Sequence, residues 1–324
     1  MAMSVIYNLN ISTQGASYGN ISSCSSTSAE YAILLSCIYI GNTLLGLILS
    51  VMVLWAIWPE VRRLLGLPFY AVNLLGAAIL ECLVLPFGVS YLLNIFTVGS
   101  LVCHVLGLIP KIVQRTAAVF LVWMFLVRYM AVKQPLKYKT LSSIWVCGSV
   151  SFTLWSIVIA ISVTEQVLTD TNTGKCFPDF RLATEWAVLD LMLSFIFNFL
   201  PLSLLCFLGH FIYRALKNSP SVPKEQRERI RKILYLAAFS FGALFCPMHI
   251  VMVYQSILLL LGYSICEVNL KVFLPYQFTF ALNSYGVAIA PIFYVFSSST
   301  VNRKLRGLMK DRQKKVNADK DLNK

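Results

Sequence analysis

Seven long runs of apolar residues alternate with short polar segments along the chain. The runs occupy residues 32–58, 67–94, 100–130, 144–164, 183–214, 230–262 and 268–296. A helix rises about 1.5 Å per residue, so each run is long enough to cross about 30 Å of hydrocarbon. The pattern therefore predicts an all-α membrane protein whose residues 32–296 form a seven-transmembrane helix bundle.

The overall composition agrees with a chain that lies mostly in lipid. Hydrophobic residues make up 58% of the 324 residues and charged residues 13%, with a mean hydropathy of +0.72. An average soluble domain has about 25% charged residues, so an ordinary soluble fold is excluded. The length leaves room for one bundle with short loops and for no large additional domain.

Lysine and arginine gather on alternate sides of the predicted spans, which indicates the orientation of the chain in the membrane. They follow the first, third and fifth spans and fill the tail, at Arg62, Arg63, Lys133, Lys137, Lys139, 214–232 and 303–324. We therefore expect an extracellular N-terminal segment at 1–31 and a cytoplasmic segment at 297–324 in the plasma membrane. The net charge of +13 then suits anionic membrane lipids and not nucleic acid.

The two segments outside the bundle carry their own signals. Residues 1–31 lack the charged start and apolar middle of a cleavable signal peptide, and they hold glycosylation sequons at Asn10 and Asn20. After the last span, Ser297–Arg312 has apolar residues at helical spacing and predicts a short amphipathic helix along the inner membrane surface. Four cysteines, Cys24, Cys103, Cys176 and Cys266, map to the outer, oxidising side and permit three disulfide pairings.

Several polar residues fall within the predicted spans, where a charged side chain costs at least about 2.5–3.5 kcal/mol. Lys111 and Arg115 share one helical face, and Gln114 lies between them. One interpretation is a cationic site for a carboxylate or phosphate; the other is internal pairing, for which Asp190 is a candidate. Further candidate ligand-binding residues are His249, Tyr254 and Gln277.

The spacing of a set of individual residues resembles that of rhodopsin-like (class A) G-protein-coupled receptors over nearly the whole chain. Cys103 opens the third span and Arg128-Tyr129 closes it 25 residues later, while Trp155 lies in the middle of the fourth. The sixth span has Phe241, Phe245 and Pro247, and the seventh ends in Pro291-Ile-Phe-Tyr294. Prolines also interrupt the second and fifth spans, at Pro86 and Pro201.

The resemblance implies a receptor that couples to a heterotrimeric G protein through Arg128, Tyr129 and Tyr294. It also implies disulfides Cys103–Cys176 and Cys24–Cys266. Within the family, the stretches Cys266-Glu-Val and Phe199-Leu-Pro-Leu are similar to hydroxycarboxylic acid and oxoeicosanoid receptors. This similarity implies a small anionic ligand, a carboxylate or an oxidised lipid, and an inhibitory G protein.

The chain also departs from the family pattern at two places. The positions that normally surround a buried sodium ion carry Ser50, Ala78, Ala117 and Ala290, and three of these four have no side-chain oxygen. We therefore expect the usual sodium site to be lost, although Glu81 lies one turn from Ala78. In the family pattern an acidic residue precedes the arginine that corresponds to Arg128, and this chain has Val127 there. A second acid, at the end of the sixth helix, is replaced by Arg227. We therefore expect Arg128 to be less restrained.

Other classes of function find less support. The three histidines show no zinc-ligand spacing, and no nucleophile or phosphate-loop motif is present, so we expect no enzyme activity, cofactor or metal centre. A transporter would favour repeat symmetry across two halves, which an odd number of spans does not suit. A chemosensory or decoy receptor with weakened or constitutive coupling is the alternative that the missing motif residues favour.

Overall fold

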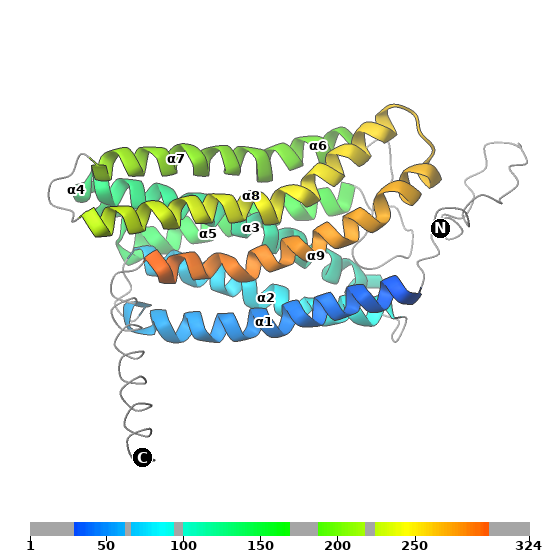
Figure 1. Cartoon of the computed structure of the whole chain (residues 1–324), viewed down its shortest axis with the longest axis horizontal. Helices are drawn as coiled ribbons and strands as arrows, with labels where there is room; N and C mark the ends of the chain where they lie inside the picture. The colour runs from blue at the N-terminus through cyan, green and yellow to red at the C-terminus, as the bar shows by residue number, and fades with distance from the viewer. Residues whose placement is uncertain (1–28, 62–65, 94–99, 169–186, 218–223, 298–324) are drawn as a thin grey trace, which may run out of the picture.

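The computed structural model describes residues 29–61, 66–93, 100–168, 187–217 and 224–297, and these residues are almost entirely helical (Figure 1). The long helices are α1 (Ala29–Val61), α2 (Leu67–Leu92), α3 (Ser100–Lys133), α5 (Ile144–Leu168), α8 (Lys224–Leu260) and α9 (Ile265–Ser297). A further rod consists of α6 (Ala187–Ser194), the π turn η3 (Phe195–Phe199) and α7 (Leu200–Lys217). These elements confirm the seven-helix bundle.

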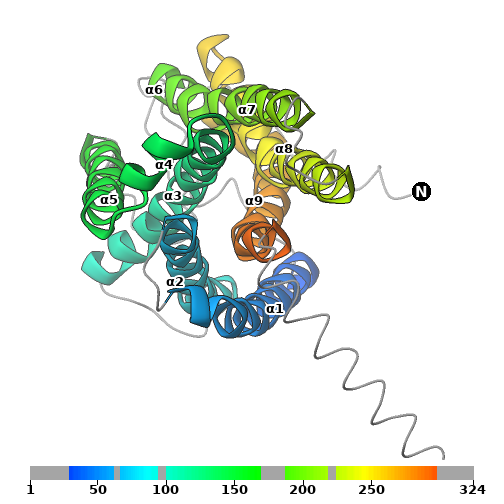
Figure 2. The ribbon, with the colours of Figure 1, turned by 90° about the vertical axis from the view of Figure 1, so that its left-hand side faces the viewer.

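The seven rods run side by side, and the view along them shows that they enclose a common interior (Figures 1 and 2). The start of α1 and the end of α9 lie at opposite ends of the bundle, as an odd number of crossings requires (Figure 1). Among the described helices, six are apolar and long enough to span a membrane. The seventh, α9, has 33 residues and is also long enough, but it carries several buried polar side chains.

Most predicted boundaries lie within a few residues of the observed ones, with two informative differences. The fourth span does not end at residue 164, because α5 continues to Leu168 and so includes Glu165. The fifth span contains a single π turn before Pro201, which was not expected. A short helix, α4 (Pro135–Leu141), follows α3; it starts with proline, a residue that suits the first helical position.

Several predictions concern parts of the chain that lie outside the described residues. These are the sequons at Asn10 and Asn20, the cysteines Cys24 and Cys176, and the amphipathic helix after residue 297. Cys103, Cys266 and Tyr294 lie in described helices, but their side chains are not described. Both disulfides, the glycosylation sites and the cytoplasmic helix therefore stay predictions.

Apolar side chains occupy both the interior and the exterior of the bundle. Tyr70, Phe120 and Phe241 are fully buried between helices, whereas Trp145, Phe152 and Phe239 are largely exposed on the outside. A soluble protein rarely exposes such extended apolar surface. The distribution fits a bundle whose outer surface contacts lipid.

A polar connection fixes α2 against α5 inside the bundle. The Trp155 indole Nε1 donates a hydrogen bond to Asn73 Oδ1 over 3.0 Å. The Asn73 amide nitrogen donates to Ser151 Oγ at 3.2 Å and to the Phe69 carbonyl at 3.0 Å. Because lipid offers no competing hydrogen bonds, these contacts set the packing of α5 on α2.

Gly286 on α9 makes room for an aromatic ring on α8. A Cβ at this position would lie 2.5 Å from Phe245 Cε2 and 3.1 Å from Leu244 Cβ. The Phe245 ring stacks on Phe241, with ring centroids 4.6 Å apart and planes 11° from parallel. The absence of a side chain at Gly286 thus determines where this pair of rings sits.

We predict that Gly286→Ala destabilises the protein, because the new methyl group displaces Phe245 from its stack. Overpacking of this kind costs about 1–3 kcal/mol. The measurement is the thermal unfolding midpoint of the purified protein in detergent. Gly76→Ala is the matched control, since a Cβ on Gly76 meets nothing within 4 Å. Equal midpoints for both variants would contradict the prediction.

Candidate functional site

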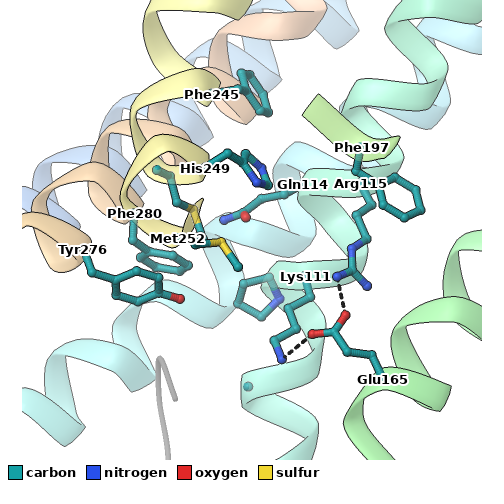
Figure 3. Close-up of a pocket in the computed structure, with 13 residues that line it drawn as sticks. Lys111, Gln114, Arg115, Glu165, Phe197, Phe245, His249, Met252, Tyr276 and Phe280 are labelled. Carbon is teal, nitrogen blue, oxygen red and sulfur yellow. Dashed lines mark hydrogen bonds and ion pairs between the residues drawn. The ribbon is translucent and has the colours of Figure 1, made fainter. Parts of the chain in front are cut away.

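A pocket opens beside α3 where the sequence predicted a ligand site (Figure 3). Its cavity volume is about 60 Å³, and a single water occupies about 10–15 Å³ by this measure, so it holds a few waters. Residues from α3, α5, η3, α8 and α9 surround it: Gly107, Pro110, Lys111, Gln114, Arg115, Glu165, Phe197, Phe245, Met248, His249, Met252, Tyr276 and Phe280.

One wall of the pocket is charged, and its acid comes from α5. Lys111 Nζ lies 3.1 Å from Glu165 Oε1, and Arg115 Nη2 forms an ion pair with Glu165 Oε2 (Figure 3). The side chains of Glu165, Arg115 and Lys111 are 7%, 12% and 24% exposed. The shared helical face predicted for Lys111 and Arg115 is confirmed, because both reach the same carboxylate.

Arg115 is held on three sides. Its Nη1 donates a hydrogen bond to Ser162 Oγ over 2.8 Å, and Ser162 lies one turn before Glu165 on α5. The guanidinium also lies over the Phe197 ring, 5.0 Å from its centroid, a cation–π arrangement. The π turn η3, which contains Phe197, places this ring at the pocket. These contacts orient the arginine without a ligand.

The opposite wall is apolar and adaptable. Met248 and Met252 from α8 and Tyr276 and Phe280 from α9 line it. Figure 3 shows Met252, Tyr276 and Phe280 across the pocket from the ion pairs. Methionine has a flexible, polarisable side chain that adjusts to differently shaped apolar groups. Between the two walls, His249 Nδ1 lies 3.4 Å from Ser194 Oγ. The pocket therefore combines a cationic end with an apolar end.

The structure gathers some predicted site residues and separates others. Lys111, Gln114, Arg115 and His249 all line the pocket. Tyr254 does not: its side chain is 49% exposed on the outside of α8. Gln277 is buried outside the pocket and accepts a hydrogen bond from the Tyr39 hydroxyl of α1, 3.3 Å away. Tyr276, its neighbour, takes the lining position instead.

Glu165 was missed by the sequence argument, which named Asp190 as the partner of Lys111. In the structure Glu165 contacts both Lys111 and Arg115, and it lies one residue beyond the predicted end of the fourth span. A signal for it was present. Residues 165–168 contain no proline or glycine, so nothing stops the helix before Leu168.

A second buried acid, Glu81, lies on α2 away from these cations. Its Oε1 accepts a hydrogen bond from the Ser284 hydroxyl of α9 over 2.7 Å. Ala78 and Ala117, two positions of the family's sodium site, are buried in the apolar core and offer no oxygen. The side chain of Ala290 is not described, and Ser50 is buried.

At the end of the bundle predicted to couple to a G protein, other residues stand where the family pattern has acidic ones. Val127 is 1% exposed and belongs to the apolar core. Arg227 donates a hydrogen bond to the Lys217 carbonyl at the end of α7, 3.0 Å away. Tyr129 packs edge-on against Phe211 of α7. Arg227 thus ties α8 to α7, in place of the acid that the family pattern puts there.

A comparison with known families decides the class of this protein. The family described as the 7 transmembrane receptor (rhodopsin family) matches residues 18–294. The chain belongs to this family. It is accordingly a multi-pass membrane receptor of the rhodopsin-like G-protein-coupled class, and this is a family of receptors, not of enzymes.

Individual relatives are distant but cover most of the chain. G-protein coupled receptor 68 of Homo sapiens is 24% identical over 294 residues, covering 88% of this chain and 79% of the relative. G-protein coupled receptor 183 of Mus musculus is 23% identical over 283 residues, which cover 82% of this chain and 79% of the relative. Lysophosphatidic acid receptor 6 of Mus musculus is 25% identical over 250 residues, which cover 73% of this chain and 72% of the relative. The likeness to hydroxycarboxylic acid receptors stays a prediction.

We predict that sodium does not stabilise this receptor, because Ala78 and Ala117 supply no ligand oxygen for the ion. The thermal midpoint of the purified protein should be the same in sodium chloride as in choline chloride at equal ionic strength. A rhodopsin-family receptor with a complete sodium site is the positive control. A clear rise with sodium in this receptor would show that Glu81 or another group restores the site.

Proposed function

We propose that this receptor binds a small anionic amphiphile, a carboxylate or an oxidised lipid, and activates a heterotrimeric G protein of the inhibitory class. The observation that supports the ligand class is the division of the pocket into two walls. Lys111 and Arg115 lie on one side, and methionine and aromatic side chains lie on the other. An amphiphile satisfies both surfaces at once, because its charged head and apolar body separate in the same way.

Arg115 is suited to the head group. A guanidinium has five N–H donors, and its bonds to Ser162 and Glu165 use only part of this capacity. It can therefore bind a ligand anion while Ser162 and Phe197 keep it oriented. Lys111, one turn away, adds a second positive charge at the same face. With two cations and one carboxylate, this wall carries a net positive charge that favours an anion over a neutral or cationic ligand.

The apolar wall suits the body of the ligand, provided that its side chains move. A cavity of about 60 Å³ is smaller than a drug-sized site of about 300 Å³ or more. Met252 and Met248 can change rotamer at low cost and so enlarge the space. The name of the lysophosphatidic acid receptor 6 relative refers to an anionic lipid, which agrees with an anionic amphiphile, although its phosphate monoester head carries more charge than a carboxylate.

The G protein is proposed to bind at the end of the bundle where basic residues gather. Lys133 at the end of α3, Lys137 and Lys139 in α4, and Lys217 at the end of α7 all belong to this end, as does the start of α8 (Figure 1). Such an excess indicates the cytoplasmic side and leaves the start of α1 outside the cell. Arg128, Tyr129 and Tyr294 are the proposed coupling residues.

A ligand panel tests the proposal, with nucleotide exchange on purified inhibitory G protein as the measurement. Carboxylates, oxidised fatty acids and lysophosphatidate are applied to the wild-type receptor, and at least one should activate it. For that agonist, Arg115→Ala should lower potency by about tenfold or more, because a charge-assisted hydrogen bond is lost.

The matched control is Lys271→Ala. Lys271 lies outside the pocket, where its ammonium group is 4.8 Å from the centroid of the Tyr263 ring. Its removal should leave the potency unchanged at equal surface expression. An agonist that acts equally well on Arg115→Ala, or activation by neutral and cationic compounds alone, would refute the anionic ligand class.

A second candidate, a receptor with constitutive or weakened coupling, is favoured by one observation: Val127 is packed in the core where the family pattern has an acid. Without that neighbouring carboxylate, the inactive position of Arg128 has lost one of its usual restraints. Nucleotide exchange without ligand should then exceed the background of receptor-free membranes.

The Val127→Asp variant should lower this basal rate, and Val127→Ala is the control for loss of packing alone. Surface expression of all variants must match before the rates are compared. A basal rate equal to background in a receptor that still responds to agonist would contradict constitutive coupling. Absence of exchange with every G protein, with or without agonist, would identify a decoy.

A further inference from the structure

Glu165 already occupies the position that a ligand anion would seek. Its two carboxylate oxygens face the two cations of the pocket, Oε1 toward Lys111 and Oε2 toward Arg115. The side chain is 7% exposed and lines the same cavity (Figure 3). Any anion that approaches either cation therefore comes within a few ångströms of a fixed, buried negative charge.

This negative charge does not repel all anions equally. The Coulomb energy between two groups is proportional to the product of their charges, so a dianion is repelled twice as strongly as a monoanion. At a separation of several ångströms in a partly buried site, each unit of ligand charge corresponds to about tenfold or more in affinity. The two cations attract the dianion more strongly too, but Glu165 cancels one of their two positive charges. The single positive charge that is left does not repay the larger cost of removing a dianion from water.

We propose that Glu165 is the specificity-determining residue that makes the pocket select singly charged anions over doubly charged ones. Carboxylates and phosphodiesters carry one negative charge, whereas a phosphate monoester carries about −1.5 to −2 at pH 7. The inference rests on the proposed function, since it requires the ligand anion to bind at this wall. It separates this receptor from one built for a phosphate monoester.

The geometry allows the charge to be removed without loss of shape. Glutamine has the same length as glutamate, and its amide oxygen can still accept a hydrogen bond from Arg115 or Lys111. Arg115 keeps its bond to Ser162 Oγ at 2.8 Å and its place over Phe197. Glu165→Gln thus changes the charge of the wall while the cations stay oriented by other contacts.

The test uses the full-length receptor and two probes with one tail and different charges. Dodecyl phosphate is the doubly charged probe, and its methyl diester is the singly charged one, both at pH 8. Affinities are measured by the ligand-induced thermal shift and by competition with a fluorescent fatty acid. The wild-type receptor should prefer the diester. Glu165→Gln should bind dodecyl phosphate about tenfold more tightly and should change the preference in its favour.

Three variants control this result. Glu165→Asp keeps the charge and should keep the wild-type preference, while Glu165→Met lacks the charge and should reproduce the change if the glutamine variant does not fold. Glu267→Gln removes an acid outside the pocket, whose carboxylate accepts a hydrogen bond from the Ser264 hydroxyl over 3.0 Å. Its preference should equal that of the wild type.

The outcomes distinguish this inference from the proposed function. If both probes bind the wild type, lose affinity in Arg115→Ala, and keep the same ratio in both uncharged Glu165 variants, the role of Glu165 is refuted and the anionic pocket stands. If neither probe binds the wild type or the uncharged variants, both proposals are refuted. A wild-type preference for dodecyl phosphate would refute the inference alone.

Discussion

The fold depends on the fact that hydrocarbon offers no hydrogen bonds to a backbone N–H or C=O group. Each such group must therefore find its partner inside the chain, and a continuous helix satisfies nearly all of them. Seven rods follow from seven apolar runs, and polar side chains that need a partner on another helix turn inward. Glu81, Gln277 and Asn283 are buried between helices for this reason, and Asn73 is half-buried. The polar interior is thus a consequence of the hydrocarbon that surrounds the bundle.

Within that interior, the charged wall is the feature that packing alone does not explain. A buried ion pair gives little net stability against apolar residues of the same size, because desolvation offsets most of the attraction. Joining α3 to α5 through two cations that share Glu165 therefore adds little stability for the desolvation it requires. Neutral hydrogen bonds such as that from Trp155 to Asn73 join α2 to α5, so the cost of a buried ion pair between α3 and α5 points to recognition.

The seven spans were predictable because apolar length is a strong signal, and Lys111 and Arg115 because two charges inside a span are rare. The other site residues depended on where each helix ends and on how it is rotated about its own axis. Glu165 was missed because the predicted fourth span ends at residue 164, four residues before the end of α5. Tyr254 lies about 200° around α8 from Met252 at 100° per residue, so a lining Met252 turns Tyr254 outward. The π turn at Phe195–Phe199 could not be predicted, because it produces no periodic pattern of apolar residues in the sequence.

The pocket and the centre of the bundle meet at one aromatic pair. Phe245 lines the pocket and stacks on Phe241, which is buried in the main core with Ala78 and Ala117. Where the family pattern has oxygen ligands and an ion, this receptor has packed apolar side chains. A ligand that pushes Phe245 must therefore displace a close-packed neighbour, because such a core does not deform gradually. Gly286, against which the ring rests, is the place where this movement has least room.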